Sequence, residues 1–236
     1  MVFDGMQKIK IGGLQKSSLI DYPGRISAIV FTQGCNFRCP YCHNPELIAA
    51  AVVSEWTSSS VLDFLKTRVG KLDAVVITGG EPCLQDGLEA FISEIKSLGF
   101  LVKLDTNGSY PDVLKKILDA KLVDYVAMDI KAPLEKYSQV VCCEVDTSSV
   151  LKSIKLLKKS GVDCEFRTTV VKSQLNIDDF EKIGNMISGG QKYYLQKFVP
   201  TKTLNKKFLD QETYTDEEFE QIKMGLNKHI KEVYVR

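Results

Sequence analysis

Short apolar runs rich in β-branched residues alternate with amphipathic stretches along the chain, and this rhythm constrains the fold more than any other feature. Strands that are apolar on both faces and separated by helices are typical of parallel pairing with helices on both sides of the sheet. The six expected strands span residues 26–32, 74–78, 101–105, 125–130, 164–171 and 193–198. The expected helices span residues 59–67, 87–98, 111–119, 149–159 and 177–186, and a helix at 216–229 precedes a short strand at 232–235.

Six strand–helix units are too few for the eight that close a TIM barrel. Right-handed crossovers between parallel strands nevertheless curl the sheet. We therefore expect an α/β fold in the form of an open, partial (β/α)6 TIM-like barrel. No Pro-, Gly- or Ser-rich linker divides the 236 residues, so we expect a single domain over 1–236, with residues 214–236 as its C-terminal helix and strand.

Polar or ligand-type residues recur where the expected strands end. The carboxyl ends of parallel strands meet at one edge of a sheet, where α/β folds place their chemistry. In chain order, these residues are Gly34-Cys35, Gly79-Gly80-Glu81-Pro82, Asp105-Thr106-Asn107-Gly108, Asp129 with Lys131, Arg167, and Gln196. A purely structural protein has no need of such an edge, so we expect a functional site there.

Cys35, Cys39 and Cys42 lie within eight residues, in a loop expected at 33–45. Three thiolates from one loop can bind one metal centre, and a four-iron cluster, which normally takes four cysteines, would then keep one iron without a protein ligand. An open position of this kind is what a catalytic metal site needs. Zinc bound by the three cysteines and His43 is a competing interpretation, although His43 adjoins Cys42 and would be strained. Three buried thiols are the structural alternative.

Charge and hydropathy exclude several classes of protein. Lysine and arginine number 31 against 30 acidic residues, and a net charge of +1 gives no general attraction to nucleic acid or lipid headgroups. No apolar run approaches the roughly 20 residues of a membrane span, and residues 1–5 do not resemble a signal peptide. We expect a cytoplasmic protein without a nucleic-acid or membrane partner. In that reducing compartment, seven cysteines are ligands or buried thiols rather than disulfides.

The cysteine spacing, with the aromatic Tyr41 before the last cysteine, resembles the signature of the radical S-adenosylmethionine (SAM) superfamily. The resemblance implies a [4Fe–4S] cluster on Cys35, Cys39 and Cys42, whose fourth iron chelates SAM, together with the partial barrel of the radical SAM core. It implies an oxidoreductase with no catalytic residue beyond the cluster and SAM. The cofactor-binding set that it implies is Tyr41, Gly79, Gly80, Glu81, Asp105, Thr106, Asn107, Asp129, Lys131, Arg167 and Gln196.

Each of these residues also has a structural interpretation. Gly79-Gly80-Glu81 resembles the element that binds the SAM amino group, because glycines admit a close backbone approach and a carboxylate accepts from an ammonium, but it is alternatively a simple turn. The run from Asp105 to Gly108 resembles a loop that approaches SAM, and is alternatively an Asx-type turn. Arg167 would pair with a carboxylate or be a strand-edge charge.

Two of these assignments follow from the family alone. Asp129 and Lys131 resemble a pair that contacts the SAM ribose and carboxylate, and some members of the family hold a monovalent cation near the positions of Asp105, Thr106 and Asp129. Gln196 stands where related activases often carry histidine, which puts its contact with the nucleoside in doubt.

Two segments resemble one branch of the superfamily, the activases of glycyl radical enzymes. These are Cys42-His43-Asn44-Pro45 and the run 12–25, which resembles the lead-in of anaerobic ribonucleoside-triphosphate reductase activating proteins. The resemblance implies a glycyl radical enzyme as partner, the anaerobic ribonucleotide reductase, and flavodoxin or ferredoxin as electron donor. One alternative is a radical SAM enzyme that acts on a small molecule, such as 7-carboxy-7-deazaguanine synthase, and another is a non-catalytic metal-binding scaffold.

The remaining four cysteines lie outside the loop. Free cysteine usually behaves as a small buried hydrophobe, and we expect this of Cys142, Cys143 and Cys164. Cys83 directly follows Glu81-Pro82, and a reactive role for it would require an activating environment.

Overall fold

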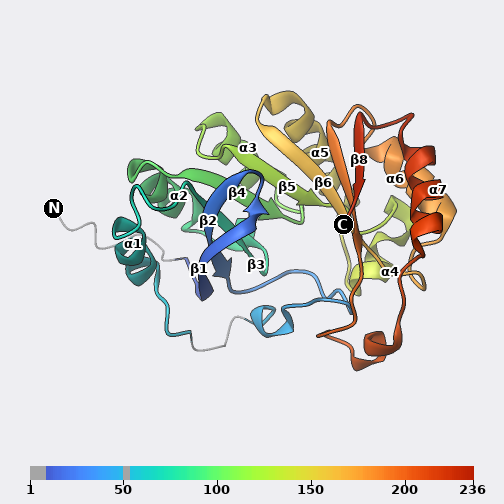
Figure 1. Cartoon of the computed structure of the whole chain (residues 1–236), viewed down its shortest axis with the longest axis horizontal. Helices are drawn as coiled ribbons and strands as arrows, with labels where there is room; N and C mark the ends of the chain where they lie inside the picture. The colour runs from blue at the N-terminus through green and yellow to red at the C-terminus, as the bar shows by residue number, and fades with distance from the viewer. Residues whose placement is uncertain (1–8, 50–53) are drawn as a thin grey trace. The chain divides into compact units, whose positions relative to one another are not determined.

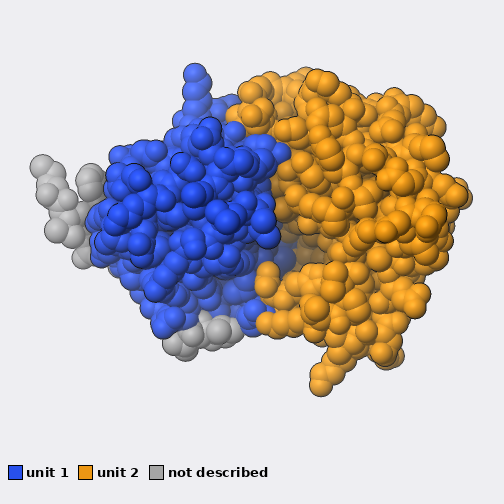
Figure 2. Space-filling view, viewed as in Figure 1, with its two compact units in different colours: residues 1–36, 46–106, 112–126 blue, residues 37–45, 107–111, 127–236 orange. Residues whose placement is uncertain are grey.

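The computed structural model describes residues 9–49 and 54–236. Residues 1–5, considered above for a signal peptide, lie outside the described part. The chain separates into two compact units, coloured in Figure 2: unit 1 comprises residues 1–36, 46–106 and 112–126, and unit 2 comprises 37–45, 107–111 and 127–236. The expectation of a single domain stays a prediction.

Unit 1 contains four strands that pair in chain order (Figure 1). β1 (Ile11–Tyr22) is antiparallel to β2 (Arg25–Thr32), whereas β2, β3 (Ala74–Gly79) and β4 (Leu101–Thr106) are parallel. The helices that begin and end inside this unit are α1 (Ser58–Lys66), η2 (Pro82–Leu84) and α2 (Leu88–Ser97). Two more, η1 (Pro45–Leu47) and α3 (Pro111–Asp119), have all but their first residue in it.

The parallel strands of unit 1 are buried on both faces. In β3, neighbouring side chains that point to opposite faces, such as Val75 and Val76, are both at most 1% exposed. Helix α1 begins at a capping box between Thr57 and Ser60, and its apolar stripe is buried. Continuous apolar strands between capped amphipathic helices are the pattern that the sequence predicts.

Unit 2 contains most of β5 (Tyr125–Asp129) and the parallel strands β6 (Asp163–Val170), β7 (Lys192–Lys197) and β8 (Glu232–Val235). Its helices are η3 (Leu134–Lys136), α4 (Tyr137–Val141), α5 (Thr147–Ser160), α6 (Ile177–Met186), η4 (Lys206–Asp210) and α7 (Asp216–Leu226). Strand order in the eight-stranded sheet follows chain order from β1 to β8. None of the helices in the described part of the chain is long and apolar enough to cross a membrane.

Each of the strands and helices predicted from the sequence is present, with ends within three residues of the expected ones. Besides the four short helices η1 to η4, two described elements were not expected, the strand β1 and the short helix α4. β1 carries the polar run Gln15–Ser18, and register shifts interrupt its pairing with β2, so its sequence lacks the regular alternation of a strand.

Candidate functional site

Gly79 and Gly80, at the end of β3, pack directly against the backbone of Thr32 and Gly34. A Cβ atom on Gly79 would lie 2.3 Å from Thr32 N, and one on Gly80 would lie 2.1 Å from Gly34 O. Gly80 N–H donates to Thr32 O at 2.9 Å, and Glu81 N–H donates to Gly34 O at 2.8 Å. The glycines therefore bring β3 against the segment that leads into Cys35, which is a structural reason for two residues without a Cβ.

Glu81 is 1% exposed and links the ends of two neighbouring strands. Its Oε1 accepts from Cys83 N–H at 3.0 Å, where it caps η2, and from the Thr106 hydroxyl at the end of β4 at 2.7 Å. Burial, together with the neighbouring Glu81 carboxylate, raises the pKa of Cys83 well above its usual value. Cys83 is therefore a protonated, structural thiol, without the activating environment that a nucleophile needs.

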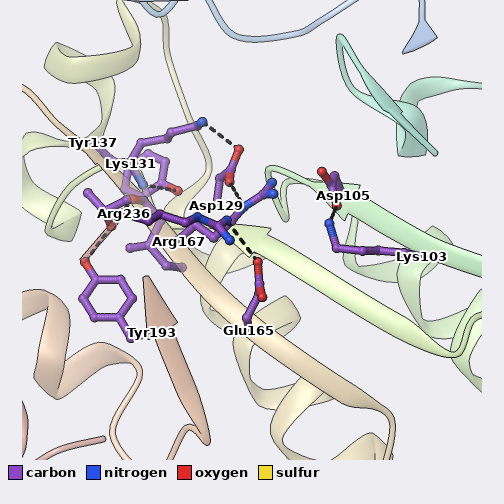
Figure 3. A network of polar contacts seen from close by, with 11 residues as sticks. Lys103, Asp105, Asp129, Lys131, Tyr137, Glu165, Arg167, Tyr193 and Arg236 are labelled. Carbon is purple, nitrogen blue, oxygen red and sulfur yellow. Dashed lines mark hydrogen bonds and ion pairs between the residues drawn. The ribbon is translucent and has the colours of Figure 1, made fainter. Parts of the chain in front are cut away.

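Asp105 forms a buried ion pair that the sequence analysis missed. Lys103 Nζ lies 2.6 Å from Asp105 Oδ1, and the two side chains are only 4% and 13% exposed (Figure 3). Residues two apart on a strand share a face, so β4 places both charges together. The sequence does contain a signal for this ion pair, because a lysine between Val102 and Leu104, inside an apolar strand, requires a buried partner.

Asn107 builds the turn that follows β4. Its Oδ1 accepts from the Ser109 backbone N–H at 3.0 Å and from the Ser109 hydroxyl at 2.5 Å. Gly108 has φ +75°, and a Cβ there would meet Met128 Cε at 2.0 Å. The Asx-type turn, which was the structural alternative for this segment, is present.

Asp129 is held between two cations (Figure 3). Lys131 Nζ donates to its Oδ2 at 2.9 Å, and Arg167 Nε donates to its Oδ1 at 2.8 Å. Burial alone would raise the pKa of Asp129, but Arg167 and Lys131 hold it well below its usual range. Burial likewise opposes the charge of Lys131, yet Asp129 holds the pKa of that amine well above its usual value. All three groups are therefore charged at neutral pH.

Buried hydrogen bonds fix β5 against β6 so that these charges meet. Ile130 N–H donates to Arg167 O at 2.7 Å, and the Thr168 hydroxyl donates to Ile130 O at 2.7 Å. The Tyr193 hydroxyl in turn donates to Thr168 Oγ1 at 2.6 Å (Figure 3). The Glu165 carboxylate, on the same strand as Arg167, accepts from Arg236 at 3.3 Å. The hydrogen-bonded register between the end of β5 and β6 therefore places Asp129 beside Arg167.

The three cysteines of the loop fall in both units. Cys35 lies in unit 1, where its N–H donates to Ile48 O at 3.3 Å, and Cys39 and Cys42 lie in unit 2, where Cys42 N–H donates to Cys39 O at 3.1 Å. Burial raises the pKa of Cys39 to about 11, with Cys42 and Asp129 adding to the effect and Lys131 opposing it. No disulfide joins any of the seven cysteines, all of which are described.

Among residues 9–49 and 54–236, no three His, Cys, Asp or Glu side chains form a group that could hold a metal ion. The ligand set therefore stays a prediction. His43 does not favour the zinc interpretation, since its Nε2 lies 2.9 Å from Val199 O and its ring stacks on Phe198.

Tyr41 offers a test of whether a cofactor fits here. Its side chain is buried, and apart from the adjacent Cys39 thiol, a weak hydrogen-bonding group, its hydroxyl has no hydrogen-bond partner in the described part of the chain. Burial raises its pKa well above the usual value, and Cys39 and Lys131 are among the charges that act on it. A buried hydroxyl without a partner costs about 1–3 kcal/mol, which a bound ligand can recover. The buried hydroxyl and the neighbouring thiols therefore fit a site that is completed by a bound group.

The remaining candidates are less informative. Gln196 is half-buried on β7, where it pairs in register with Thr169. Cys143 and Cys164 are half-buried, and burial raises the pKa of both thiols. The expectation of burial is wrong for Cys142, which is exposed because it ends α4 in the left-handed conformation, with φ +52°.

Comparisons with known proteins give a consistent result. The model of the radical SAM superfamily matches residues 29–187. A Methanocaldococcus jannaschii protein, provisionally named a glycyl-radical enzyme activating enzyme, is 35% identical over 97% of this chain and 96% of its own. The 7-carboxy-7-deazaguanine synthase of Thermococcus kodakarensis is 26% identical over 79% of this chain and 80% of its own.

A likeness to a solved structure confirms the expected fold class. Streptococcus suis SuiB, in its crystal structure with the precursor peptide SuiA, matches with a TM-score of 0.66 and 12% identity, over 87% of this chain and 47% of that chain. At this identity the match speaks for the fold alone. Together with the eight-stranded sheet, it confirms the α/β fold that the strand–helix rhythm predicts.

Proposed function

This chain belongs to the radical SAM superfamily, and we propose that it is an activase that cleaves SAM reductively and generates a glycyl radical on a partner enzyme. The full-length likeness to the Methanocaldococcus jannaschii protein carries the proposal, because it extends over 97% of the chain rather than over the cysteine motif alone. The residues after the third cysteine, His43 and Asn44, support the same branch. The enzyme class follows from the family itself.

Cys35, Cys39 and Cys42 would hold the [4Fe–4S] cluster as thiolates and leave one iron for SAM. When bound, the cluster supplies the electron that cleaves SAM to methionine and a 5′-deoxyadenosyl radical. The chain's own task at Cys39 is to release a proton, since its pKa of about 11 keeps the thiol neutral until a metal replaces that proton.

The charges of unit 2 support a role in binding the SAM carboxylate. Asp129, Lys131 and Arg167 together carry a net charge of +1, in a setting where their side chains are at most 25% exposed. Two cations that contact one carboxylate in a partly buried setting favour the approach of a further carboxylate. The buried hydroxyl of Tyr41, which has only the Cys39 thiol beside it, adds a donor that the nucleoside or the carboxylate can use.

In unit 1, Glu81 supports the proposed contact with the SAM ammonium. The Cys83 N–H and the Thr106 hydroxyl fix its carboxylate from one side. A carboxylate held in this way is preorganised to accept from a cation. The backbone of Gly79 and Gly80 contributes indirectly, through its close packing against Thr32 and Gly34.

The proposal also covers the two proteins that would act together with this chain. We extend the proposal to the anaerobic ribonucleotide reductase as the glycyl radical enzyme, and to flavodoxin or ferredoxin as electron donor. The run 12–25 supports the reductase, because it resembles the lead-in of activating proteins of that enzyme. Electron paramagnetic resonance of the reductase after anaerobic mixing should show a glycyl doublet. If no candidate glycyl radical enzyme gives a doublet, the assignment is refuted.

A small-molecule substrate is the second candidate. The similarity to the 7-carboxy-7-deazaguanine synthase of Thermococcus kodakarensis, over 79% of this chain, favours it. His43 and Asn44 weigh against it, because that class usually carries Asp-Thr after the third cysteine. The two functions separate in one assay: such a synthase would convert its small-molecule precursor without any protein partner.

A monovalent cation near Asp105, Thr106 and Asp129 completes the proposal. Lys103 already pairs with Asp105, and Lys131 and Arg167 already pair with Asp129, so the chain supplies cations of its own at both carboxylates. The affinity for SAM should be measured in potassium, sodium and N-methylglucamine buffers. Equal affinities in all three would remove the cation from the proposal.

Anaerobic loading with iron and sulfide tests the core of the proposal. The loaded protein should be brown, should bind SAM and should release 5′-deoxyadenosine under dithionite. Replacement of Cys35, Cys39 or Cys42 by alanine should abolish cleavage, whereas Cys142→Ala, an exposed cysteine outside the loop, should leave it unchanged. Full turnover in a loop variant would remove that cysteine from the ligand set.

A further inference from the structure

The segment between β7 and α7 lies against the cysteine loop, and we call residues 198–210 the strap. Asn205 N–H donates to Pro40 O at 2.9 Å, and the Phe208 ring packs 6.4 Å from the ring of Tyr41. At its start, Phe198 stacks on His43 with ring centroids 5.7 Å apart. All of these residues belong to unit 2, in which Figure 1 shows the strap in orange to red with η4 in its second half.

The strap exposes several large apolar side chains. Val199, Leu204 and Leu209 are 54%, 39% and 41% exposed. Three large exposed apolar side chains within eleven residues are more than the isolated exposed leucine of an ordinary surface. They lie on the same segment that contacts the cysteine loop through Phe198, Asn205 and Phe208.

The strap is also basic. Over residues 198–210 it carries Lys202, Lys206 and Lys207 against one acidic residue, Asp210, whereas the whole chain has a net charge of only +1. All three lysines are exposed, and neither Lys206 nor Lys207 forms an ion pair with any residue that the structure describes. By contrast, Lys197, just before the strap, pairs with Asp216. The strap therefore carries three lysines against one aspartate, and Lys206 and Lys207 have no ion-pair partner among the described residues.

We propose that the strap is the docking surface for the protein that reduces this enzyme, an acidic one-electron carrier with an exposed redox centre. The inference rests on the proposed function, which requires one electron from outside for each SAM cleaved. The donor's reduced flavin or iron–sulfur centre loses one electron and the enzyme's cluster gains it, without making or breaking a bond. Exposed apolar side chains together with exposed lysines suit such a carrier, because charge complementarity speeds encounter and orients the partner.

The lysine-rich face of α5 provides a matched control. Lys155 and Lys159 are exposed, and no ion pair joins them to a described residue. They lie four residues apart on a helix, so they also form a local positive patch. No hydrogen bond or ring contact joins this helix to the cysteine loop in the described part of unit 2.

The experiment compares K206E/K207E with K155E/K159E, which make the same change in charge. Binding of oxidised flavodoxin and of oxidised ferredoxin to the cluster-loaded proteins is measured by titration calorimetry in 50 mM and 500 mM salt. We expect the strap variant to raise the Kd of the donor about tenfold in low salt, with the difference nearly lost in high salt. The control variant should stay within about twofold of wild type.

Cleavage of SAM separates this proposal from the function on which it rests. With dithionite, both variants should release 5′-deoxyadenosine at the wild-type rate; with reduced flavodoxin, only the strap variant should show a raised apparent KM. If wild-type protein does not cleave SAM with dithionite, the proposed function fails, and the calorimetry still reports on the strap.

Five results would overturn docking of the donor on the strap. Four of them are an unchanged Kd in K206E/K207E, an equal loss in K155E/K159E, no binding of either donor to wild type, and a loss of cleavage with dithionite. A glycyl radical yield that falls under dithionite while the Kd of the donor holds would also overturn it, because the strap would then bind the glycyl radical enzyme.

Discussion

Replacement of Asp129 by asparagine tests the charge arrangement that the proposed site depends on. Asparagine keeps the size of the side chain and one acceptor oxygen, but it removes the negative charge between Lys131 and Arg167. Both cations then remain in a setting where their side chains are only 14% and 12% exposed. We therefore expect Asp129→Asn to lower the free energy of unfolding.

The magnitude follows from the contacts. Removal of one partner from a fully buried ion pair costs about 3–5 kcal/mol. The Asp129 side chain is 25% exposed, so water recovers part of that loss, and asparagine retains one acceptor for Arg167. We expect a loss of about 2–3 kcal/mol at pH 7, in line with two charge-assisted hydrogen bonds weakened by substitution.

The loss should depend on pH with a defined sign. Because the pKa of folded Asp129 lies well below its usual range, its contribution to stability is fully present above the unfolded pKa of about 3.9. The contribution is lost as pH falls below that value toward the folded pKa, by about 1.4 kcal/mol per pH unit. The difference between wild type and Asp129→Asn should therefore be constant from pH 7 to pH 5 and should narrow below pH 4.

Urea unfolding of the cluster-free proteins, followed by circular dichroism at several pH values, measures this difference. Asp63→Asn serves as the control, since Asp63 pairs with Lys66 at the surface with both side chains more than 60% exposed, and we expect no measurable change there. A loss below about 1 kcal/mol at pH 7, or a difference that does not narrow in acid, would refute the reasoning that Asp129 is ionised and held by both cations.

Three further predictions each concern a substitution that adds or removes one heavy atom. Gly80→Ala should lower the free energy of unfolding by about 2–4 kcal/mol and reduce iron loading, because its Cβ would lie 2.1 Å from Gly34 O; urea unfolding and iron content measure this, and a fully stable variant would contradict it. Gly225→Ala, exposed in α7 with nothing within 4 Å of the new Cβ, should raise unfolding free energy by about 0.5 kcal/mol, and a loss would show strain that the structure does not contain. Tyr41→Phe should change the stability of the cluster-free protein by no more than about 1 kcal/mol, because the buried hydroxyl that it removes has only the weakly bonding Cys39 thiol beside it, yet weaken SAM binding to the loaded protein; an unchanged SAM affinity would separate that hydroxyl from the cofactor.

The sequence predicts the parallel strands and the helices well, because they are specified by local patterns. Val75 and Val76 show why: a strand buried on both faces needs a continuous apolar run, and few other structures do. The antiparallel strand β1 has no such continuous apolar run. It carries four consecutive polar residues from Gln15 to Ser18, and it forms a strand because β2 supplies its partners across register shifts.

The candidate site was predictable in its residue types and less so in its interactions. Glu81 and Asp129 could be chosen because each follows a buried strand, where α/β folds gather polar groups. Their partners could not be chosen, because Thr106 and Arg167 reach them through pairing between strands distant in sequence. The left-handed backbone that exposes Cys142 is likewise a feature of how α4 ends, which the adjacent cysteines did not signal.

The sequence contains two similar lysine–aspartate pairs, and only the structure shows that their surroundings differ in charge. Lys103 with Asp105, and Asp129 with Lys131, are similar patterns in the sequence, each a lysine two residues from an aspartate. In the structure the first is an ion pair between one cation and one carboxylate, while Arg167 joins the second, so that two cations contact one carboxylate. Two cations around one carboxylate favour a further carboxylate more than a single ion pair does. The Asp129 site, rather than Asp105, is therefore where we expect a carboxylate of the cofactor to bind.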